Sequence, residues 1–324
     1  MSSVAEHDPR RAPPRAETVV DLAAIRHNVS LLAGSAARSG AATMAVVKAD
    51  GYGHGALPVA RAALSAGASW IGVCTMSEAL ALRAGGITAR VLSWLDLSDE
   101  DYRPAVEGGI DLSVSSMRQL AAVRAAAVGA DRPARVHLKI DTGLSRGGEA
   151  QAGWPALVDA AAKAAIDGHF EVVSVWSHLA HGDEPDHPML DRQAARLDAA
   201  WRLAREAGLT PIRHLANSAA TMTRPDLHYD LVRPGIAVYG LDPLGRPVAQ
   251  SPLRPAMTFR ARVALVKRVP AGEGVSYGHE WTTRTETTLA LLPVGYADGV
   301  PRRLGSRPSG VGGMEVLLAG RRRP

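Results

Sequence analysis

The sequence predicts an α/β protein, with a (β/α)8 TIM barrel followed by a mainly β C-terminal domain. Short runs rich in Val, Ile and Leu alternate with Ala-, Leu- and Arg-rich helical patterns up to about Leu241, and this alternation is typical of βα units around a parallel sheet. Beyond that point a Pro-rich stretch, DPLGRPVAQSPLRP, leads into short apolar runs with no long helical pattern between them. That change indicates β structure.

Eight runs qualify as barrel strands because each is short, rich in branched apolar residues and followed by turn residues. They span 44–48, 71–75, 91–95, 111–115, 136–141, 172–178, 213–217 and 230–235. The helical segments between them include LPVARAALSAG and LDRQAARLDAAWRLAREAG, and several end in glycine, a common helix C-cap. An earlier run at 17–22 has no place in the count of eight and is a candidate strand of the second domain.

These patterns divide the chain into three segments. We expect residues 1–16, which are polar and rich in Pro and Arg, to form a disordered N-terminal tip. Residues 17–242 would form the barrel, and residues 243–324 a partial β domain. With 324 residues, 46% of them apolar, the chain can bury a core in each domain.

Charge and cysteine content argue against several classes of protein. The formal net charge of +5 comes from 37 basic and 32 acidic residues spread along the chain, whereas nucleic-acid binding needs a basic face or stripe. No apolar run reaches membrane length, and the N-terminus has no apolar signal segment. We therefore expect a cytoplasmic protein without nucleic-acid or membrane partners. The single cysteine, Cys74 in WIGVCTM, excludes an internal disulfide, and we expect a buried core thiol there.

Reactive residues stand where the predicted strands end, which is where TIM barrels place their active sites. These strand-end residues are Lys48, Lys139, Asp141, His178, Asn217, Ser218, Arg233 and Gly235. A lysine shielded by barrel walls can lose its charge through desolvation and form a Schiff base with a carbonyl cofactor. The helix start NSAA at 217–220 and the glycine turn RPGI at 233–236 are places where free N–H groups can face a phosphate.

Together these residues suggest pyridoxal phosphate as a cofactor. The glycines of GYGHG, directly after Lys48, let the backbone approach a ligand closely, and Tyr52 can offer a hydroxyl group to an anion. Each feature alone has a plainer interpretation. A lysine at a strand end is usually exposed to solvent, and a glycine turn is usually only a turn.

The chain also carries, in this order, the motifs VVKADGYGHG, LKIDTGLSRGG, WSHLAHGDE, HLANSAA, VRPGIAVYG, VSYG and LLPVGYADGVPRRL. This series resembles that of the alanine racemases, which are pyridoxal-phosphate enzymes with an N-terminal barrel and a C-terminal β domain. The resemblance extends from about Thr18 to the last residue. VSYG and GYADG, combined with the lysine motif, are its most specific part.

The resemblance implies two catalytic residues. Lys48 would bind the cofactor as a Schiff base and act on one face of the substrate Cα, while Tyr277 of VSYG, from the second subunit of a homodimer, would act on the other face. A tyrosine with its reference pKa of about 10 is a poor base, so Tyr277 would need a neighbouring hydrogen-bond donor or positive charge, which His178 would supply. Arg233 would donate to the pyridine nitrogen, which would then be unprotonated because a guanidinium cannot accept a hydrogen bond.

The remaining implied roles concern the cofactor and the substrate. Besides Lys48, His178 and Arg233, the cofactor-binding residues would be Tyr52, Asn217, Ser218, Gly235 and Ile236. Arg146 would lie near the substrate carboxylate, supported by Lys139, which is carbamylated in some family members. Tyr296 of GYADG would line the substrate entrance; its plainer alternative is a packed tyrosine of the β domain.

We expect no metal site. The stretch HLAHGDEPDH places His181 and His187 at a metal-like spacing, but a loop implies no ligand geometry. We therefore expect these two histidines, and His54, in surface loops.

The chain stops at GRRRP, where the family pattern continues into a segment resembling VGRVCMDQ and further strands. That part normally supplies a methionine amide and an aspartate near the substrate and a tyrosine near the phosphate. A sheet cut in mid-course also leaves an unpaired edge. We therefore expect a fragment of a longer gene product.

The leading hypothesis is a racemase that interconverts L-alanine and D-alanine by a two-base mechanism and supplies D-alanine for peptidoglycan. Serine or lysine racemisation would be substrate-level variants of it. The alternatives are a non-catalytic pyridoxal-phosphate-binding protein or an inactive racemase fragment, and a decarboxylase on the same barrel plan. Tyr277 and Tyr296 favour the racemase, because a one-domain carrier would lack both.

Overall fold

The computed structural model describes residues 14–301 and 315–323. The chain divides into two compact units, one formed by Val20–Met257 and the other by the segment from Thr258 onward together with the residues up to Val19. The change of pattern in the sequence predicts this boundary near residue 242. Most of the expected N-terminal tip, residues 1–13, lies outside the described residues, and a strand already begins at Ala16.

The first unit is an eight-stranded parallel barrel, as the alternating pattern predicted. Its strands are β2 (Ala42–Val46), β3 (Trp70–Val73), β4 (Arg90–Ser93), β5 (Asp111–Val114), β6 (Ala134–Lys139), β7 (Phe170–Trp176), β8 (Ile212–His214) and β9 (Leu231–Val232). They lie side by side in the order β8-β7-β6-β5-β4-β3-β2-β9. Backbone hydrogen bonds from Asp230 N–H to Arg213 O (3.1 Å) and from Arg233 N–H to Ala216 O (2.9 Å) join the two end strands.

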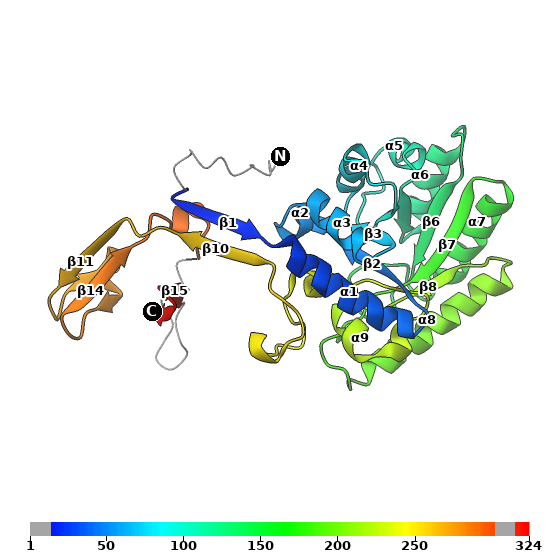
Figure 1. The fold of residues 1–324 in the computed structure, drawn as a ribbon. Coiled ribbons are helices and arrows are strands. Elements are labelled where there is room, and N and C mark those ends of the chain that lie inside the picture. The colour runs from blue at the N-terminus through cyan, green and yellow to red at the C-terminus, as the bar shows by residue number, and fades with distance from the viewer. Residues whose placement is uncertain (1–13, 302–314, 324) are drawn as a thin grey trace. The chain divides into compact units, whose positions relative to one another are not determined.

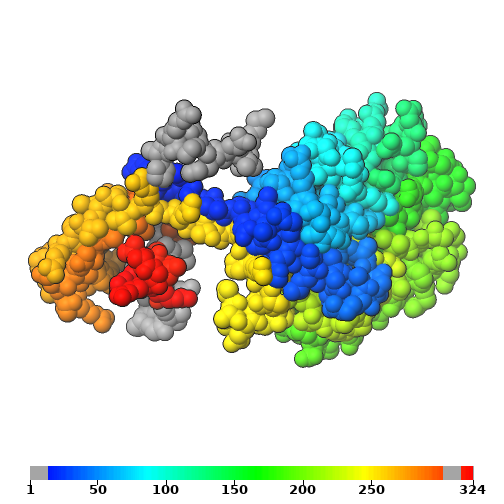
Figure 2. Space-filling model, in the orientation of Figure 1, coloured from blue at the N-terminus to red at the C-terminus, as the bar shows by residue number. Residues whose placement is uncertain are grey.

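Helices cover the outside of this sheet (Figure 1). They are α1 (Leu22–Arg38), α3 (Ala56–Ser65), α4 (Met76–Ala84), α5 (Arg103–Glu107), α6 (Met117–Ala127), α7 (Trp154–Ile166), α8 (Met189–Glu206) and α9 (Ser218–Thr223). α1 begins where the Asp21 carboxylate accepts hydrogen bonds from the Ala23 and Ala24 N–H groups, an N-cap that the sequence encodes locally. Figure 2 shows this helix, in blue, on the surface of the barrel unit.

The strands place their residues alternately on two sides, so the barrel has two cores. Between sheet and helices lie fully buried residues such as Ile71, Leu112 and Leu138. Met44 and Leu92 belong to a separate apolar cluster at alternate positions of their strands. Polar residues in the same strands are buried too, including His137 and His214, both 0% exposed. The barrel interior is thus partly polar.

The second unit is mainly β, as predicted. β1 (Ala16–Val20) pairs with β10 (Met257–Ala261), so the early strand does join the sheet that opens the second unit. Three further pairs follow: β11 (Leu265–Val269) with β14 (Thr287–Leu291), β12 (Gly274–Val275) with β13 (Trp281–Thr282), and β15 (Val316–Leu318) with β16 (Arg321–Arg323). Within the described ranges, none of the helices has the length and apolarity needed to cross a bilayer.

Candidate active site

The lysine that follows β2 stands on a left-handed turn. Lys48 opens α2 (Lys48–Tyr52), in which Ala49, Asp50 and Tyr52 have φ values of 52°, 52° and 53°. Residues other than glycine rarely adopt this conformation, which costs about 1–2 kcal/mol for each. The sequence predicted a glycine turn here, but not left-handed backbone at an alanine and an aspartate. Strain of this kind persists only where the surroundings over-determine the backbone.

One carboxylate, that of Glu78 in α4, holds this turn from outside. Its Oε1 accepts a hydrogen bond from Ala49 N–H at 2.6 Å, and its Oε2 accepts from Cys74 N–H at 2.8 Å and from Thr75 N–H at 3.2 Å. Glu78 is also the third residue of α4 and forms a capping box with the N-cap residue Thr75. A single side chain therefore ties the backbone directly after Lys48 to the turn between β3 and α4.

Tyr52, Ser218 and Gly235 come together at the rim. The Ser218 hydroxyl oxygen accepts hydrogen bonds from Gly235 N–H (2.8 Å) and Ala237 N–H (3.3 Å). A Cβ at position 235 would lie 2.5 Å from the Tyr52 hydroxyl, so a larger residue there would have to displace that hydroxyl group. The result is a cradle of hydroxyl and backbone groups from three separate segments, suited to an anion such as a phosphate.

Two neighbours complete the cradle. The Asn217 side chain caps α9 by accepting a hydrogen bond from Ala220 N–H at 3.1 Å. Ile236 begins a 3-10 turn, Ile236–Tyr239, and is 38% exposed. The aromatic ring of Tyr52 packs against that of Tyr239, with centroids 4.7 Å apart.

Arg233 is buried beneath the rim and held from several sides. Its guanidinium donates to Ser177 O (2.8 Å), Leu215 O (3.2 Å) and His214 Nδ1 (2.8 Å). The same group lies 3.3 Å from His178 Nδ1. Burial lowers the pKa of Arg233 to about 9. Because a guanidinium has only donors, each histidine nitrogen facing it must be an acceptor.

Burial and the positive charge of Arg233 also lower the pKa of His178, to about 3. His178 is therefore neutral, with its proton on Nε2, since Nδ1 faces a donor. Burial, followed by the charge of Arg233, likewise lowers the pKa of Lys139 to about 8. The Lys139 ammonium lies 4.6 Å from the centre of the Trp176 ring.

Arg146 stands in an ordered loop beyond β6. The Asp141 carboxylate accepts hydrogen bonds from Gly143 N–H (2.9 Å) and Ser145 N–H (3.1 Å), and Lys139 O accepts from Glu149 N–H (2.8 Å). The loop thus folds back onto its strand. The side chains whose charge lowers the pKa of His178 are Arg233, Arg146, Lys139 and Lys48. Of these predicted site residues Arg233 lies directly against His178, and the charges of the other three act on the same ring.

Cys74 was expected in the core, and this is a correction: it is only half-buried. The charges of Lys48 and Arg146 act on its thiol, although burial dominates and raises its pKa. Cys74 is only half-buried because it follows the last residue of β3 and so lies at the rim.

The two tyrosines predicted from VSYG and GYADG belong to the second unit. Tyr277 is 77% exposed and Tyr296 is 61% exposed, each at the start of a 3-10 turn. The Asp298 carboxylate closes the second turn by accepting a hydrogen bond from Gly295 N–H at 2.9 Å. Neither tyrosine is packed into a core.

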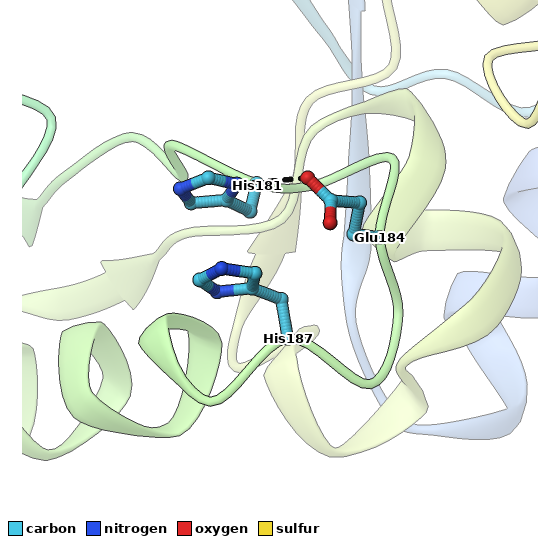
Figure 3. A group of neighbouring side chains, drawn as sticks. All are labelled: His181, Glu184 and His187. Carbon is cyan, nitrogen blue, oxygen red and sulfur yellow. Dashed lines mark hydrogen bonds and ion pairs between the residues drawn. The ribbon is translucent and has the colours of Figure 1, made fainter.

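His181, Glu184 and His187 form the group of potential metal ligands within the described part of the chain. The two imidazole rings lie face to face, with centroids 3.7 Å apart and 4° between their planes (Figure 3). Imidazole lone pairs lie in the ring plane, so one ion cannot lie in line with both rings in this arrangement. His181 Nδ1 instead lies 2.9 Å from a Glu184 oxygen, and His187 Nδ1 accepts from Met189 N–H at 3.1 Å.

His54 lies in the loop between α2 and α3. It is half-buried there, and its ring lies 4.6 Å from that of Tyr239. His54 Nδ1 lies 3.1 Å from Gly51 O and 3.0 Å from Tyr52 O, so its N–H stabilises the left-handed turn after Lys48.

Several polar residues of the barrel interior were not predicted. The most prominent are Asp111, His137, Ser174 and His214, each 0% exposed. Their signal in the sequence is a polar residue within an apolar strand, as in VHLKI and IRHLA. That signal is weak, because such a residue can face solvent on an edge strand as easily as the inside of a barrel.

Comparisons with known proteins agree over most of the chain. The family model "Alanine racemase, N-terminal domain" matches residues 20–243, and "Alanine racemase, C-terminal domain" matches residues 256–324. A curated alanine racemase of Salinispora arenicola is 56% identical over 311 residues, covering 95% of this chain and 82% of the relative. One from Frankia casuarinae is 54% identical over 314 residues, covering 95% and 79%.

Solved structures are similar as well. The alanine racemase from D-cycloserine-producing Streptomyces lavendulae is 50% identical with a TM-score of 0.90, and the alignment covers 97% of this chain and 81% of that one. A structure of alanine racemase from Bartonella henselae, described with covalently bound pyridoxal phosphate, is 28% identical with a TM-score of 0.83, covering 96% and 82%.

Proposed function

The chain belongs to the alanine racemase family and is an amino-acid racemase, and we propose that it interconverts L-alanine and D-alanine with pyridoxal phosphate bound at the barrel rim. The observation that carries this proposal is that Lys48 Nζ lies 5.7 Å from the centre of the ring of Tyr52, which belongs to the cradle formed with Ser218 and Gly235. A non-catalytic carrier is not favoured, because curated relatives named as racemases match 95% of the chain, including its second unit.

The donor set of the rim fits this cofactor. Tyr52, Ser218 and the backbone at Gly235 would hold the phosphate, with Asn217 and Ile236 beside them. Arg233, which can only donate, would hold the pyridine nitrogen as an acceptor. Lys48 would form the covalent link, and the Bartonella henselae structure is described with such a covalent cofactor. When bound, pyridoxal phosphate withdraws electrons from the substrate Cα and so acidifies its proton.

Racemisation needs a proton removed from one face of the Cα and returned to the other. Lys48 Nζ would carry the proton on one face. Tyr277 from a second copy of the chain would carry it on the other, since one group cannot easily reach both. His178 is neutral with its proton on Nε2, and that N–H would donate to the Tyr277 oxygen and stabilise its ionised form. The proposal therefore includes a homodimer with shared sites.

Arg146 would bind the substrate carboxylate, with Lys139 supporting it and Tyr296 at the substrate entrance. Lys139 is surrounded by positive charge, from Arg233 and Arg146. Its lowered pKa leaves a neutral amine near pH 8, and such an amine can add CO2 to form a carbamate with release of one proton. The resulting negative charge would pair with Arg146, so we include carbamylation of Lys139 in the proposal.

The proposed role is to supply D-alanine for peptidoglycan in the cytoplasm. The test of the activity uses the purified chain with pyridoxal phosphate in deuterated water. We expect deuterium at the α-position of L-alanine together with inversion. Borohydride reduction followed by peptide mapping should place the cofactor on Lys48. A labelled peptide elsewhere, or a loaded protein without exchange, would refute the proposal.

Two variants separate the proton-transfer roles. Lys48→Ala should abolish covalent cofactor binding. Tyr277→Phe should retain it but strongly slow α-hydrogen exchange of one alanine enantiomer only, because the second face then lacks a base. Equal loss of α-hydrogen exchange for both enantiomers would argue against Tyr277 as the second base.

A further inference from the structure

A chain of buried polar side chains runs through the barrel interior from β5 to the rim. Asp111, His137, Ser174 and His214 are each 0% exposed, and Arg233 is 5% exposed. Buried polar groups are costly unless they are hydrogen-bonded. Four of these five residues lie outside the proposed cofactor and substrate contacts.

The contacts between them are continuous. The Arg233 guanidinium donates to His214 Nδ1 at 2.8 Å. His214 Nε2 lies 2.9 Å from the Ser174 hydroxyl, which lies 2.7 Å from His137 Nδ1. His137 Nε2 lies 3.2 Å from Asp111 Oδ2. His214 Nε2 and His137 Nδ1 are also 3.0 Å apart, so the serine reinforces a direct contact.

The two ends of the chain dictate the direction of every hydrogen bond. Arg233 can only donate, so His214 Nδ1 accepts and the proton of neutral His214 lies on Nε2. At the other end an ionised Asp111 can only accept, so the proton of His137 also lies on Nε2. The Ser174 hydroxyl then accepts from His214 and donates to His137. A single arrangement of protons therefore pairs both imidazole rings and the serine hydroxyl.

Charges at the base of the barrel keep Asp111 ionised. Burial opposes ionisation, but the hydrogen bond from His137 and the charges of Arg90 and Arg135 lower the pKa of Asp111. The Arg90 guanidinium lies 2.9 Å from Asp111 Oδ2, and Arg135 Nε lies 2.6 Å from Oδ1. Burial lowers the pKa of both His137 and His214, so the two rings stay neutral.

We propose that Asp111 is a positioning residue for the racemase: through His137 and Ser174 it holds His214 in the tautomer that accepts from Arg233 and so fixes the guanidinium beneath the cofactor. This inference rests on the proposed function for the part that concerns the cofactor. The tautomers of His137 and His214 can be measured in the cofactor-free protein and do not depend on the proposed function.

The first test is nitrogen-15 NMR of the histidines in the cofactor-free protein at neutral pH, with signals assigned through single His→Gln variants. His137 and His214 should both carry the proton on Nε2. A proton on Nδ1 of either ring in the wild-type protein would overturn the proposal without any variant of Asp111.

The second test is Asp111→Asn. An amide has one acceptor in place of two, while Arg90, Arg135 and His137 all donate toward this position. We expect His137 and His214 to show a mixture of tautomers. Asp96→Asn is the matched control. Asp96 is also buried, at 8% exposure, but it accepts from Met76 N–H and the Ser93 hydroxyl, neither of which belongs to this series of hydrogen-bonded side chains. Unchanged tautomers in Asp111→Asn would overturn the proposal.

The third test uses the loaded enzyme with nitrogen-15-labelled pyridoxal phosphate. Asp111→Asn should shift the pyridine signal and lower kcat about tenfold, as expected for a weakened hydrogen bond to a charged group, with little change in KM. Asp96→Asn should do neither. If the tautomers change but the pyridine signal does not, the positioning of the cofactor by Asp111 is refuted. If the pyridine signal is also unshifted in an Arg233→Lys variant, the proposed contact between Arg233 and the pyridine nitrogen is wrong.

Discussion

Replacing Gly235 by alanine should weaken cofactor binding by displacing one hydroxyl group. The added Cβ would lie 2.5 Å from the Tyr52 hydroxyl, and its next contacts, at 3.4 Å and 3.6 Å, are ordinary. The φ of Gly235 is −114°, outside the left-handed range that favours glycine. Since the Tyr52 ring packs against Tyr239 at 4.7 Å, it has little room to yield without moving its hydroxyl away from the cradle.

The expected magnitude follows from the one hydrogen bond lost. A hydrogen bond to a charged group contributes about 1.5–3 kcal/mol, so pyridoxal phosphate should bind about 10- to 150-fold more weakly. Tyr52→Phe removes the same hydroxyl and should weaken binding equally. The double variant should behave like Tyr52→Phe alone, because the group that collides with the new methyl is gone and the ring carbon remains at 3.4 Å.

The assay is fluorescence titration of each cofactor-free variant with pyridoxal phosphate, completing a double-mutant cycle. Thermal unfolding without cofactor controls for folding. Additive effects of Gly235→Ala and Tyr52→Phe would refute the reasoning, because they would show that the methyl does not act through the tyrosine hydroxyl. Wild-type affinity in Gly235→Ala would refute it as well.

Three other outcomes are expected. Glu78→Gln should reduce covalent trapping of the cofactor on Lys48, because one side-chain oxygen cannot accept from the Ala49, Cys74 and Thr75 N–H groups together. Gln119→Glu, in the equivalent cap of α6, is its control. Equal trapping in both variants would contradict the role of Glu78 in holding the turn after Lys48. Carbon-13-labelled CO2 should give a carbamate signal that grows as pH rises through about 8 and disappears in Lys139→Arg, and a signal that persists in that variant would exclude Lys139. Burial raises the pKa of Asp96 to about 6, so the folded state binds its proton more tightly than the unfolded state and stability should fall as pH rises from about 4 to 6. Asp96→Asn should remove that decline and gain up to about 3 kcal/mol in urea unfolding at pH 7. A parallel decline in the variant would assign it to other groups.

The linear pattern of residues was sufficient for the barrel and for most of its rim. Runs of branched apolar residues repeat with helical segments between them, and parallel strands wound this way bring all their carboxyl ends to one face. Lys48, Lys139, His178, Ser218 and Arg233 could therefore be placed on one rim without knowledge of any contact. The motif series added Tyr277 and Tyr296 by resemblance.

Only the tertiary structure decided how these groups are held. The left-handed backbone at Ala49 and Asp50 depends on the carboxylate of Glu78, which comes from another βα unit, and no local pattern encodes that contact. The same holds for Asp111, His137 and His214, which belong to three different strands and meet because the barrel closes. A tautomer is set by the partners on both sides of a ring. Those partners exist only once the chain is folded.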